Sequence, residues 1–389
     1  MRLLPLLFFW ACAQILSAQT ATALSDSSSI SLMTVAPGEE LYSLFGHSAL
    51  RVRDRAQRLD RCYNYGTFDF DQPQFLLKFC RGKLLYCLDI ESYRNFEYGN
   101  IADRRAMREQ ILNMDREQRQ RLFDLLETNA KPENRSYKYD FFYDNCATRI
   151  RDIVGEAFYY QNQYDSSGLA QPKTMRQLLR PYLAQHPWTE FGIDLVLGRA
   201  ADRRANAADF MFLPDYLHDL FGKAKPDGVT PLVKAERSIP EYSFQQPDWQ
   251  PDFFSRPLWV MCFVALIGLL CMANPRNERS FDFIFWLVLG LAGLIMALLW
   301  FATDHSATKM NLNIMWALPT HLLFFWRRNR TEVTEAYFAG AAILAALALL
   351  FWYWMPQEMP VAAIPIAGLV VVKGLWRRYR QAASTEPQP

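Results

Sequence analysis

Residues 45–52 read Phe-Gly-His-Ser-Ala-Leu-Arg-Val, a stretch that predicts a glycine turn running into a short strand near His47. A second stretch, residues 143–151, reads Tyr-Asp-Asn-Cys-Ala-Thr-Arg-Ile-Arg and predicts the start of a helix with Cys146 in its first turn. A cysteine at a helix N-terminus beside an imidazole is the usual arrangement that makes a thiol nucleophilic at neutral pH. We therefore expect His47 and Cys146 to form a catalytic pair for covalent acyl chemistry.

The residues just before Cys146 strengthen this expectation. Asp144 and Asn145 are natural N-cap residues, and the unpaired N–H groups of a first helical turn stabilise a thiolate and can act as an oxyanion hole. Asn145 would add a side-chain donor there, and Asp144 is a second orienting candidate. The competing interpretation of Cys146 is a buried structural thiol or one half of a disulfide.

A third residue normally orients the imidazole in such a pair. We expect it on the strand that pairs with the His47 strand, residues 63–69, which read Tyr-Asn-Tyr-Gly-Thr-Phe-Asp. Asn64 is the first candidate. The other candidates on this strand are Tyr63, Tyr65 and Asp69.

Two arginines near the pair, Arg51 and Arg149, are candidates for binding a lipid phosphate, although arginines in such places are more often solvated. The sequence contains no HExxH, paired CxxC, Walker A, GxGxxG or GxSxG motif. We therefore expect no metal and no cofactor. The net charge of +2 carries no functional information, and no nucleic-acid partner is expected.

Residues 25–225 are long enough for one compact domain with its own core. Their order of elements indicates an α+β fold, with strands grouped near His47 and helices around them. Strands are expected at 29–35, 50–53, 61–70 and 83–90, and helices at 73–79, from Asp115 with Gln118 completing a capping box, from Asn145 or Cys146, and over much of 174–222.

The N-terminus predicts a secretory signal peptide over residues 1–18, with Arg2 as its charged region and Ser17-Ala18 as a cleavage site. An uncleaved anchor is the alternative. Export places the following domain in an oxidising compartment, where disulfides can form. Pairing among Cys62, Cys80 and Cys87 is left open.

From Pro257 the chain becomes strongly apolar, which predicts a transmembrane domain over residues 257–376. A proline-rich juxtamembrane linker is expected at 226–256 and a cytoplasmic tail at 377–389. Five candidate spans follow one another at 257–273, 281–303, 311–326, 335–355 and 360–376.

Basic residues follow the first, third and fifth spans, and this bias orients a membrane protein. These clusters are Arg276 and Arg279; Arg327, Arg328 and Arg330; and Lys373, Arg377, Arg378 and Arg380. We expect them in the cytoplasm, which places the N-terminal domain in the periplasm of an inner-membrane protein. Asp304 and His305 then lie at the periplasmic end, where they are candidates for lining the access of acyl chains.

The order of His47 and Cys146 reverses the papain order and resembles the circularly permuted NlpC/P60 branch of the papain-like superfamily. More closely, the chain resembles the Lnb N-terminal periplasmic domain family of Bacteroidetes. The resemblance is carried by residues 37–40 (Pro-Gly-Glu-Glu), 45–51, 63–70 and 144–149, by Phe212 to Leu217, and by the segment from Asp304 to Thr308 with Asn311, Asn313, Trp316 and Pro319.

The resemblance implies a periplasmic papain-like domain followed by a transmembrane helical bundle. It also implies lipoprotein N-acyltransfer, in which Cys146 takes a fatty acyl chain from a membrane phospholipid and His47 activates the thiol. The acceptor would be the α-amino group of the diacylglyceryl-modified N-terminal cysteine of a lipoprotein. The mechanism would be ping-pong, through a thioester on Cys146.

Two other functions compete with this interpretation. The first is a cell-wall peptidase or amidase, the commoner activity of NlpC/P60 relatives, for which five spans exceed what anchoring requires. The second is a membrane assembly or sensor protein whose papain-like domain binds without catalysis. Such a protein would tolerate Cys146→Ala.

Overall fold

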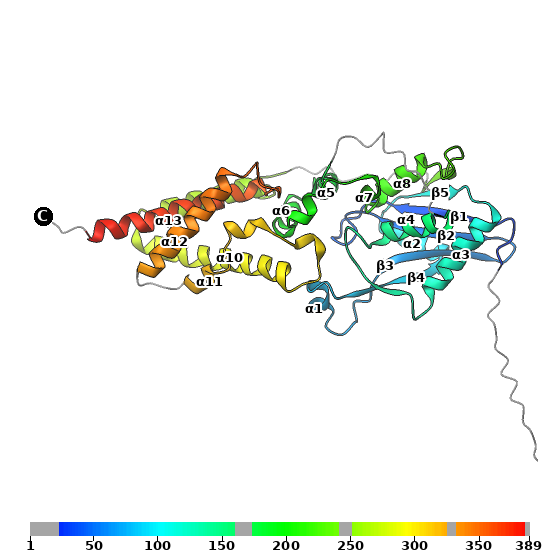
Figure 1. Ribbon diagram of the computed structural model, residues 1–389, viewed down its shortest axis with the longest axis horizontal. Helices are drawn as coiled ribbons and strands as arrows, with labels where there is room; N and C mark the ends of the chain where they lie inside the picture. Colours follow the sequence, from blue (N-terminus) through cyan, green and yellow to red (C-terminus); the bar gives the residue numbers. More distant parts are fainter. Residues whose placement is uncertain (1–22, 160–172, 241–250, 325–331, 386–389) are drawn as a thin grey trace, which may run out of the picture.

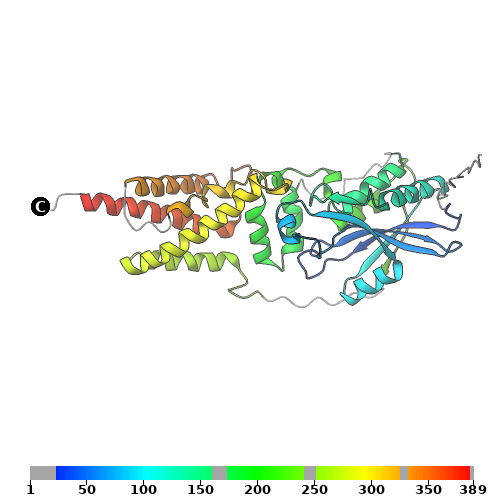
Figure 2. The same ribbon diagram turned by 90° about the horizontal axis from the view of Figure 1, so that it is seen from below.

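The computed structural model describes residues 23–159, 173–240, 251–324 and 332–385. An N-terminal α+β domain and a C-terminal helical domain lie end to end in an elongated molecule (Figure 1 and Figure 2). The predicted signal peptide lies outside the described residues, as do Arg327, Arg328 and Arg330.

Within the described residues, a seven-stranded sheet with the order β6-β4-β3-β2-β1-β5-β7 forms the centre of the N-terminal domain, and every pairing is antiparallel. The strands are β1 (Ser29–Val35), β2 (His47–Asp54), β3 (Leu59–Thr67), β4 (Leu85–Ser92), β5 (Met107–Leu112), β6 (Ser136–Lys138) and β7 (Val233–Ile239). The four strands predicted in the first ninety residues are confirmed as β1 to β4, because each alternates between two different layers of the domain.

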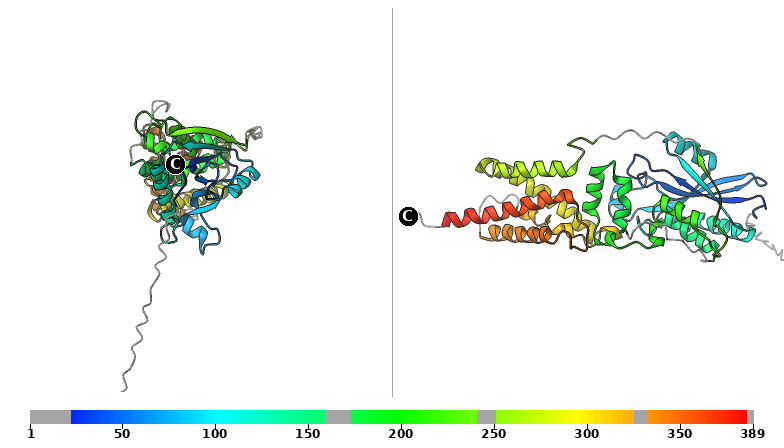
Figure 3. Two further views of the ribbon diagram at one scale, coloured as in Figure 1. Left: turned by 90° about the vertical axis from the view of Figure 1, so that its right-hand side faces the viewer. Right: turned by 90° about the horizontal axis from the view of Figure 1, so that it is seen from above.

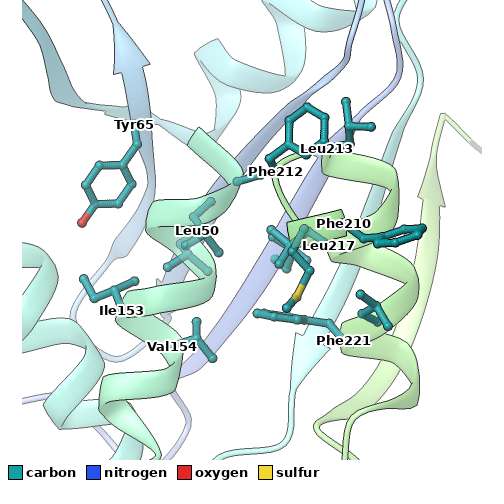
Figure 4. Close-up of a cluster of buried hydrophobic side chains, with 14 of the residues drawn as sticks. Leu50, Tyr65, Ile153, Val154, Phe210, Phe212, Leu213, Leu217 and Phe221 are labelled. Carbon is teal, nitrogen blue, oxygen red and sulfur yellow. The ribbon is translucent and has the colours of Figure 1, made fainter. Parts of the chain in front are cut away.

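Helices cover the two faces of the sheet unequally. On one face α3 (Arg116–Ala130) and α4 (Cys146–Ala157) pack over a large core that includes Leu50 and Val154 (Figure 4). On the other face α2 (Tyr93–Ala102) covers a smaller cluster around Ala49. Since side chains alternate along a strand, the odd-numbered residues of β2 that begin with His47 face the α2 side.

The cap residues fix where the two core helices begin. Asp115 and Gln118 form the predicted capping box at the start of α3. Asn145 caps α4, whose apolar residues recur at helical spacing and turn one stripe into the core. This stripe consists of Ala147, Ile150, Ile153, Val154 and Ala157.

Residues 174–222 are largely helical, as predicted. They form α5 (Met175–Leu183), α6 (Pro187–Val196), the 3-10 turn η1 (Arg199–Asp202), α7 (Ala207–Phe210) and α8 (Pro214–Lys223). The expected linker at 226–256 is wrong in its first half, because Val233–Ile239 is strand β7 and pairs with β5 at the sheet edge. An edge strand pairs on one side only, and most residues of β7 are exposed. Its apolar residues therefore alternate too weakly for the sequence to predict a strand.

The C-terminal domain consists of α9 (Pro257–Cys271), α10 (Pro275–Phe301), η2 (Ser306–Thr308), η3 (Leu312–Met315), α11 (His321–Phe324), α12 (Glu332–Leu350), η4 (Val361–Ala363) and α13 (Ile364–Thr385). Of the described helices, α10 and α12 are long and apolar enough to cross a membrane, judged by length and composition. The expected span at 311–326 is wrong as a continuous helix, because its described part is a 3-10 turn, a break before Pro319 and one short helical turn.

Basic residues of α13 lie at the end of this domain farthest from the sheet (Figure 3). Lys373 pairs with Asp282 of α10 at 2.5 Å, and Arg380 pairs with Glu278 at 2.6 Å. The basic residues near the start of α10 and those of α13 therefore share one end of the bundle, as the predicted orientation requires.

Hydrogen bonds join the two domains at the opposite end of the bundle. The Asn311 side chain donates to the carbonyl of Leu195 at 2.7 Å, and the Gly198 N–H donates to the carbonyl of Ala307 at 2.9 Å. The Gln357 side chain donates to the carbonyl of Leu197 at 3.2 Å. Because these bonds engage backbone groups of α6 and the turn after it, they hold the domains in a defined relation.

Candidate active site

The side chain of Asn145 builds the start of α4. Its Oδ1 accepts from the N–H groups of Ala147 and Thr148, both at 2.9 Å. Its Nδ2 donates to the carbonyls of Phe141 and Phe212, at 2.9 and 2.8 Å. Both amide protons are therefore engaged, so the expected role of Asn145 as an oxyanion donor is wrong. Asn145 instead fixes where the first helical turn sits.

Cys146 follows this cap, at the place where β2 and β3 separate. The two strands pair from Leu50 and Tyr63 onward, although β2 begins at His47 and β3 continues to Thr67. The N–H of Ser48 is directed at the Cys146 sulfur, which is therefore held against the residue next to His47.

A bulge in β3 lies against Cys146. Gly66 has φ of +88°, and the register with β4 shifts between Tyr65 and Thr67. A Cβ at Gly66 would lie 3.6 Å from the Cβ of Cys146, so β3 passes next to Cys146 at this glycine.

His47 begins β2 directly after Gly46, which has φ of +79°. A Cβ at Gly46 would lie 2.8 Å from the carbonyl oxygen of Val35, so the predicted turn requires glycine. The imidazole Nε2 lies 3.3 Å from Oδ1 of Asn64, which is the first-choice orienting residue.

A carboxylate fixes which atom of Asn64 faces the imidazole. The Asn64 Nδ2 donates to Oε1 of Glu91 at 2.9 Å, so its Oδ1 must be the atom that points at His47. A carbonyl oxygen only accepts, so Nε2 of His47 carries the proton and Nδ1 keeps the lone pair. The bond to Asn64 therefore determines which ring nitrogen of His47 is protonated. Glu91 was not anticipated, because nothing local in β4 distinguishes it.

Burial sets the protonation states of the pair. It lowers the pKa of His47 to about 4, assisted by the positive charge of Arg105 and opposed by the bond to Asn64. It also raises the pKa of the Cys146 thiol, against the opposing effect of N–H groups from Ser48, Ala147 and Cys146 itself. The resting pair is therefore a neutral thiol and a neutral imidazole. The N–H groups at the helix start do favour the thiolate, as expected, but desolvation has the larger effect on the pKa of Cys146.

Arg105, between α2 and β5, is the main site residue that the sequence did not reveal. Its Nε donates to the carbonyl of Ala36 at 2.9 Å, whereas its Nη2 is buried and has no hydrogen-bond partner among the described residues. Its charge lowers the pKa values of both His47 and Cys146, and burial lowers its own pKa. Arg105 could not be singled out from the sequence, because together with Arg104 it looks like part of an exposed run of charged residues.

Arg51 lies away from the reacting groups. It is 3 % exposed, and its guanidinium donates to Asp60 at 2.7 Å and to Glu109 at 3.2 Å. The Tyr93 ring covers it, with 3.3 Å between the guanidinium carbon and the ring centroid. The expected role of Arg51 in binding a lipid phosphate is wrong, because carboxylates and an aromatic ring already enclose its charge.

Three further candidates serve the architecture around α4. Arg149 makes a bidentate ion pair with Asp144, at 2.6 and 2.8 Å, and stacks over Tyr137. Tyr65 is buried in the core, and its hydroxyl accepts from Asn129 at 2.8 Å. None of these bonds involves His47, so the structure does not bring Tyr65, Asp144 or Arg149 to the imidazole.

Asp304 and His305 bridge the two domains. The Asp304 carboxylate pairs with Lys138 at 3.3 Å, which lowers the pKa of that carboxyl group. The His305 Nε2 donates to the carbonyls of Phe79 and Cys80, at 3.1 and 3.2 Å. Next to them, the Ser306 hydroxyl donates to Asp140, whose carboxylate also accepts from the N–H groups of Phe142 and Tyr143. The helical domain therefore braces the loop that leads to Cys146.

The thiols and carboxylates of the described chain form no closed metal site. Among the described residues, no group of three or more His, Cys, Asp or Glu side chains is arranged to hold a metal ion. Cys146 is a free thiol, and so are Cys62, Cys80 and Cys87, whose pairing the sequence left open.

Comparisons with known families match both halves of the chain. The model described as the Lnb N-terminal periplasmic domain matches residues 16–180, and the model described as the Lnb transmembrane domain matches residues 249–383. No curated protein and no solved structure matches the chain. The N-terminal domain is therefore periplasmic and the C-terminal domain is a membrane domain.

Proposed function

The chain belongs to the Lnb family, and from that premise we propose that it is a lipoprotein N-acyltransferase that uses Cys146 as its nucleophile. It moves a fatty acyl chain from a membrane phospholipid to the α-amino group of a lipoprotein's N-terminal diacylglyceryl-cysteine. The observation that carries the proposal is the sulfur of Cys146 at the start of α4, directed at Ser48 beside the His47–Asn64 pair.

In the first half-reaction the neutral pair reacts in concert. Nδ1 of His47 takes the thiol proton as Sγ of Cys146 attacks the ester carbonyl carbon of the phospholipid. The N–H groups of Cys146 and Ser48, which are directed at the sulfur, stabilise the developing oxyanion. The C–O bond then breaks, His47 returns its proton to the leaving alkoxide, and a lysophospholipid departs from the thioester.

In the second half-reaction the lipoprotein amine attacks the thioester carbonyl. His47 takes a proton from the attacking nitrogen and gives it to the departing sulfur, which restores the neutral thiol. An amide and a free enzyme result, so the atoms and charges balance without a cofactor. Because burial lowers the pKa of His47 to about 4, the imidazole remains an available base across the neutral range.

The proposal extends to the fold and to membrane topology. The order of His47 and Cys146 favours a circularly permuted papain-like domain of the NlpC/P60 type. We infer an inner-membrane protein whose chain crosses the membrane five times, the third time through the interrupted segment that contains η3 and α11, with a cytoplasmic C-terminus. The shared end of the basic residues on α10 and α13 supports this orientation. Labelling of a cysteine introduced at Ser384, from inside or outside intact cells, tests this topology.

The direct test is co-expression with a model lipoprotein in cells that lack their own N-acylating enzyme. Mass measurement of the lipoprotein's N-terminal peptide should show the added acyl chain with the unaltered protein. Cys146→Ser and Cys146→Ala should abolish it, because the thioester cannot form. Cys87→Ser, which removes a free, half-buried thiol of the same domain, is the matched control and should retain transfer.

Two results would overturn the proposal. Normal transfer by both Cys146 variants would remove the nucleophile. Cleavage of muropeptides by the purified protein, without any hydroxylamine-labile acyl adduct on Cys146 after incubation with phospholipid, would favour a cell-wall peptidase instead.

A further inference from the structure

Helix α1 (Phe75–Cys80) and the turn before it expose an unusual number of large apolar side chains to solvent. None of the six residues of α1 is buried. Phe70 is 64 % exposed, Leu76 is 70 % exposed and Leu77 is 52 % exposed. Large apolar groups gathered in this way on one short segment indicate a surface that meets something other than water.

This segment lies at the level where the membrane domain begins. His305 donates to the carbonyl of Phe79, and the N–H of Asp304 donates to the carbonyl of Arg81. These two residues come directly after the apolar helix α10, whose last residue, Phe301, is 73 % exposed. Figure 1 shows α1 beside this end of α10. Aromatic residues at a span's end mark the headgroup region of a bilayer.

A row of aromatic rings continues from α1 toward the interior of the N-terminal domain. Phe79 stacks on Phe75 with 6.2 Å between ring centroids, and Phe75 stacks on Phe68 at 5.8 Å. Phe68 meets Tyr86 edge-on at 5.1 Å, and Tyr86 stacks on Tyr139 at 4.3 Å. Phe79 is exposed and the other four residues are half-buried, so the row runs from the protein surface toward the interior as an apolar track.

The inner end of the row is the nucleophile. A Cβ at Gly66 would lie 3.5 Å from Cε2 of Tyr139 and 3.6 Å from Cβ of Cys146, so both side chains line the same position of β3. The residues on either side of Tyr139 are tied to the loop after α10, Lys138 through Asp304 and Asp140 through Ser306. The track is therefore anchored to the membrane domain close to both of its ends.

We propose that α1 dips into the outer leaflet, and that the row of Phe79, Phe75, Phe68, Tyr86 and Tyr139 binds a fatty acyl chain and leads it to Cys146. The occupant is the acyl chain of a membrane phospholipid, because the track is apolar and joins the membrane domain at α1. The acyl-transfer part of this inference rests on the proposed function. The insertion of α1 into the bilayer does not.

The first test uses the full-length protein in vesicles of phosphatidylethanolamine and phosphatidylglycerol that contain a phospholipid with a diazirine in its acyl chain. After irradiation, peptides covering residues 68–86 should carry cross-linked lipid. Tyr98 on α2, which is 76 % exposed, should not. Cross-links confined to the membrane helices, or protection of α1 by a second protein, would overturn the proposal.

The second test separates the insertion of α1 into the bilayer from the reactivity of Cys146. The double variant Leu76→Ser, Leu77→Ser removes apolar contact from two exposed residues, and should raise the KM for vesicle phospholipid by about tenfold or more. Acylation of Cys146 by water-soluble p-nitrophenyl acetate should stay unchanged, which also reports an intact fold. Tyr98→Ser is the matched control. An unaltered KM in the double variant would contradict the insertion of α1 into the bilayer.

The outcomes of the two proposals are distinguishable. Cross-linking at α1 and normal Cys146 acetylation, with no lipoprotein acylation, would support the proposal for α1 and contradict the proposed transferase function. Lipoprotein acylation without cross-links at α1, and with unaltered KM in the double variant, would support the transferase function and contradict the proposal for α1.

Discussion

Arg51 and Arg105 belong to the same domain, and each has most of its guanidinium covered, but their surroundings differ. Arg51 is enclosed by the carboxylates of Asp60 and Glu109 and by the ring of Tyr93. Arg105 has one hydrogen bond to a backbone carbonyl, and its Nη2 lacks a partner among the described residues.

The difference shows which buried charge is available to chemistry. A charge neutralised by its own ion pairs contributes to structure and has little effect beyond them. The charge of Arg105 has no salt bridge among the described residues and is only partly offset by nearby Asp103, so it also acts on His47 and Cys146. The sequence pointed to Arg51, whereas the structure places the active charge at Arg105. Substitutions at Arg51, Arg105, Asn64 and Lys138 test this difference between structural and functional charges.

The largest effect is expected on stability. Arg51→Met leaves the buried Glu109 with Arg237 as its one remaining ion-pair partner among the described residues and frees the part-exposed Asp60, so the cost should lie below the ~3–5 kcal/mol of a buried charge left with no partner, and it remains the largest of the four. The thermal midpoint of the purified protein should fall markedly, while alkylation of Cys146 in the folded fraction keeps its rate. Arg53→Met, at a half-exposed position, is the control and should change little. If stability is unchanged and lipid binding is lost, Arg51 would bind a lipid phosphate, as first expected from the sequence.

Arg105→Gln should reverse that pattern. The substitution removes a half-buried charge that has no salt bridge among the described residues, so stability should hold, but the pKa of Cys146 rises and activity falls, by about 10- to 100-fold on the scale of a lost electrostatic contact. The charge also lowers the pKa of His47, so the acid limb of the pH–rate profile, near pH 4 in the unaltered protein, should move to higher pH. An acid limb that stays in place would contradict the assigned influence of Arg105.

Asn64→Ala should move the acid limb in the opposite direction. The bond from Nε2 of His47 to Asn64 raises the pKa of the imidazole, so its loss should shift the limb below pH 4. Losing one neutral hydrogen bond and the orientation it provides should slow transfer by about tenfold. Asn64→Asp should shift the limb upward, because a carboxylate favours the imidazolium. Equal limbs in both variants would exclude Asn64 as the orienting residue.

The smallest effect is expected at an exposed pair. Lys138 and Asp304 meet at 3.3 Å with most of their surface in water, where screening leaves such pairs little net value. Lys138→Met should leave thermal stability and acetylation of Cys146 unchanged. The rate of transfer from vesicles should also stay close to normal. A large loss would show that this contact controls how the domains are joined.

Much of the local structure could be predicted, because its signals are short-range. The glycine turn before His47, the N-cap before Cys146 and the capping box at Asp115 each depend on residues a few positions apart. Asn64 could be named because strand pairing brings neighbouring strands of a hairpin together. Strand β7 and the broken segment at 311–326 could not be predicted, since a distant strand and the packing of other helices decide them.

The sequence by itself determined the two-domain organisation and the helix that begins at Cys146, and it singled out His47 and Cys146 as the pair that we propose to react, since composition and local spacing suffice for these. Only the tertiary structure decided that the thiol rests neutral, that Arg51 is enclosed and that Arg105 faces the site. The physical reason is that a pKa or the availability of a charge depends on every group within several ångströms, and those groups come from distant parts of the chain.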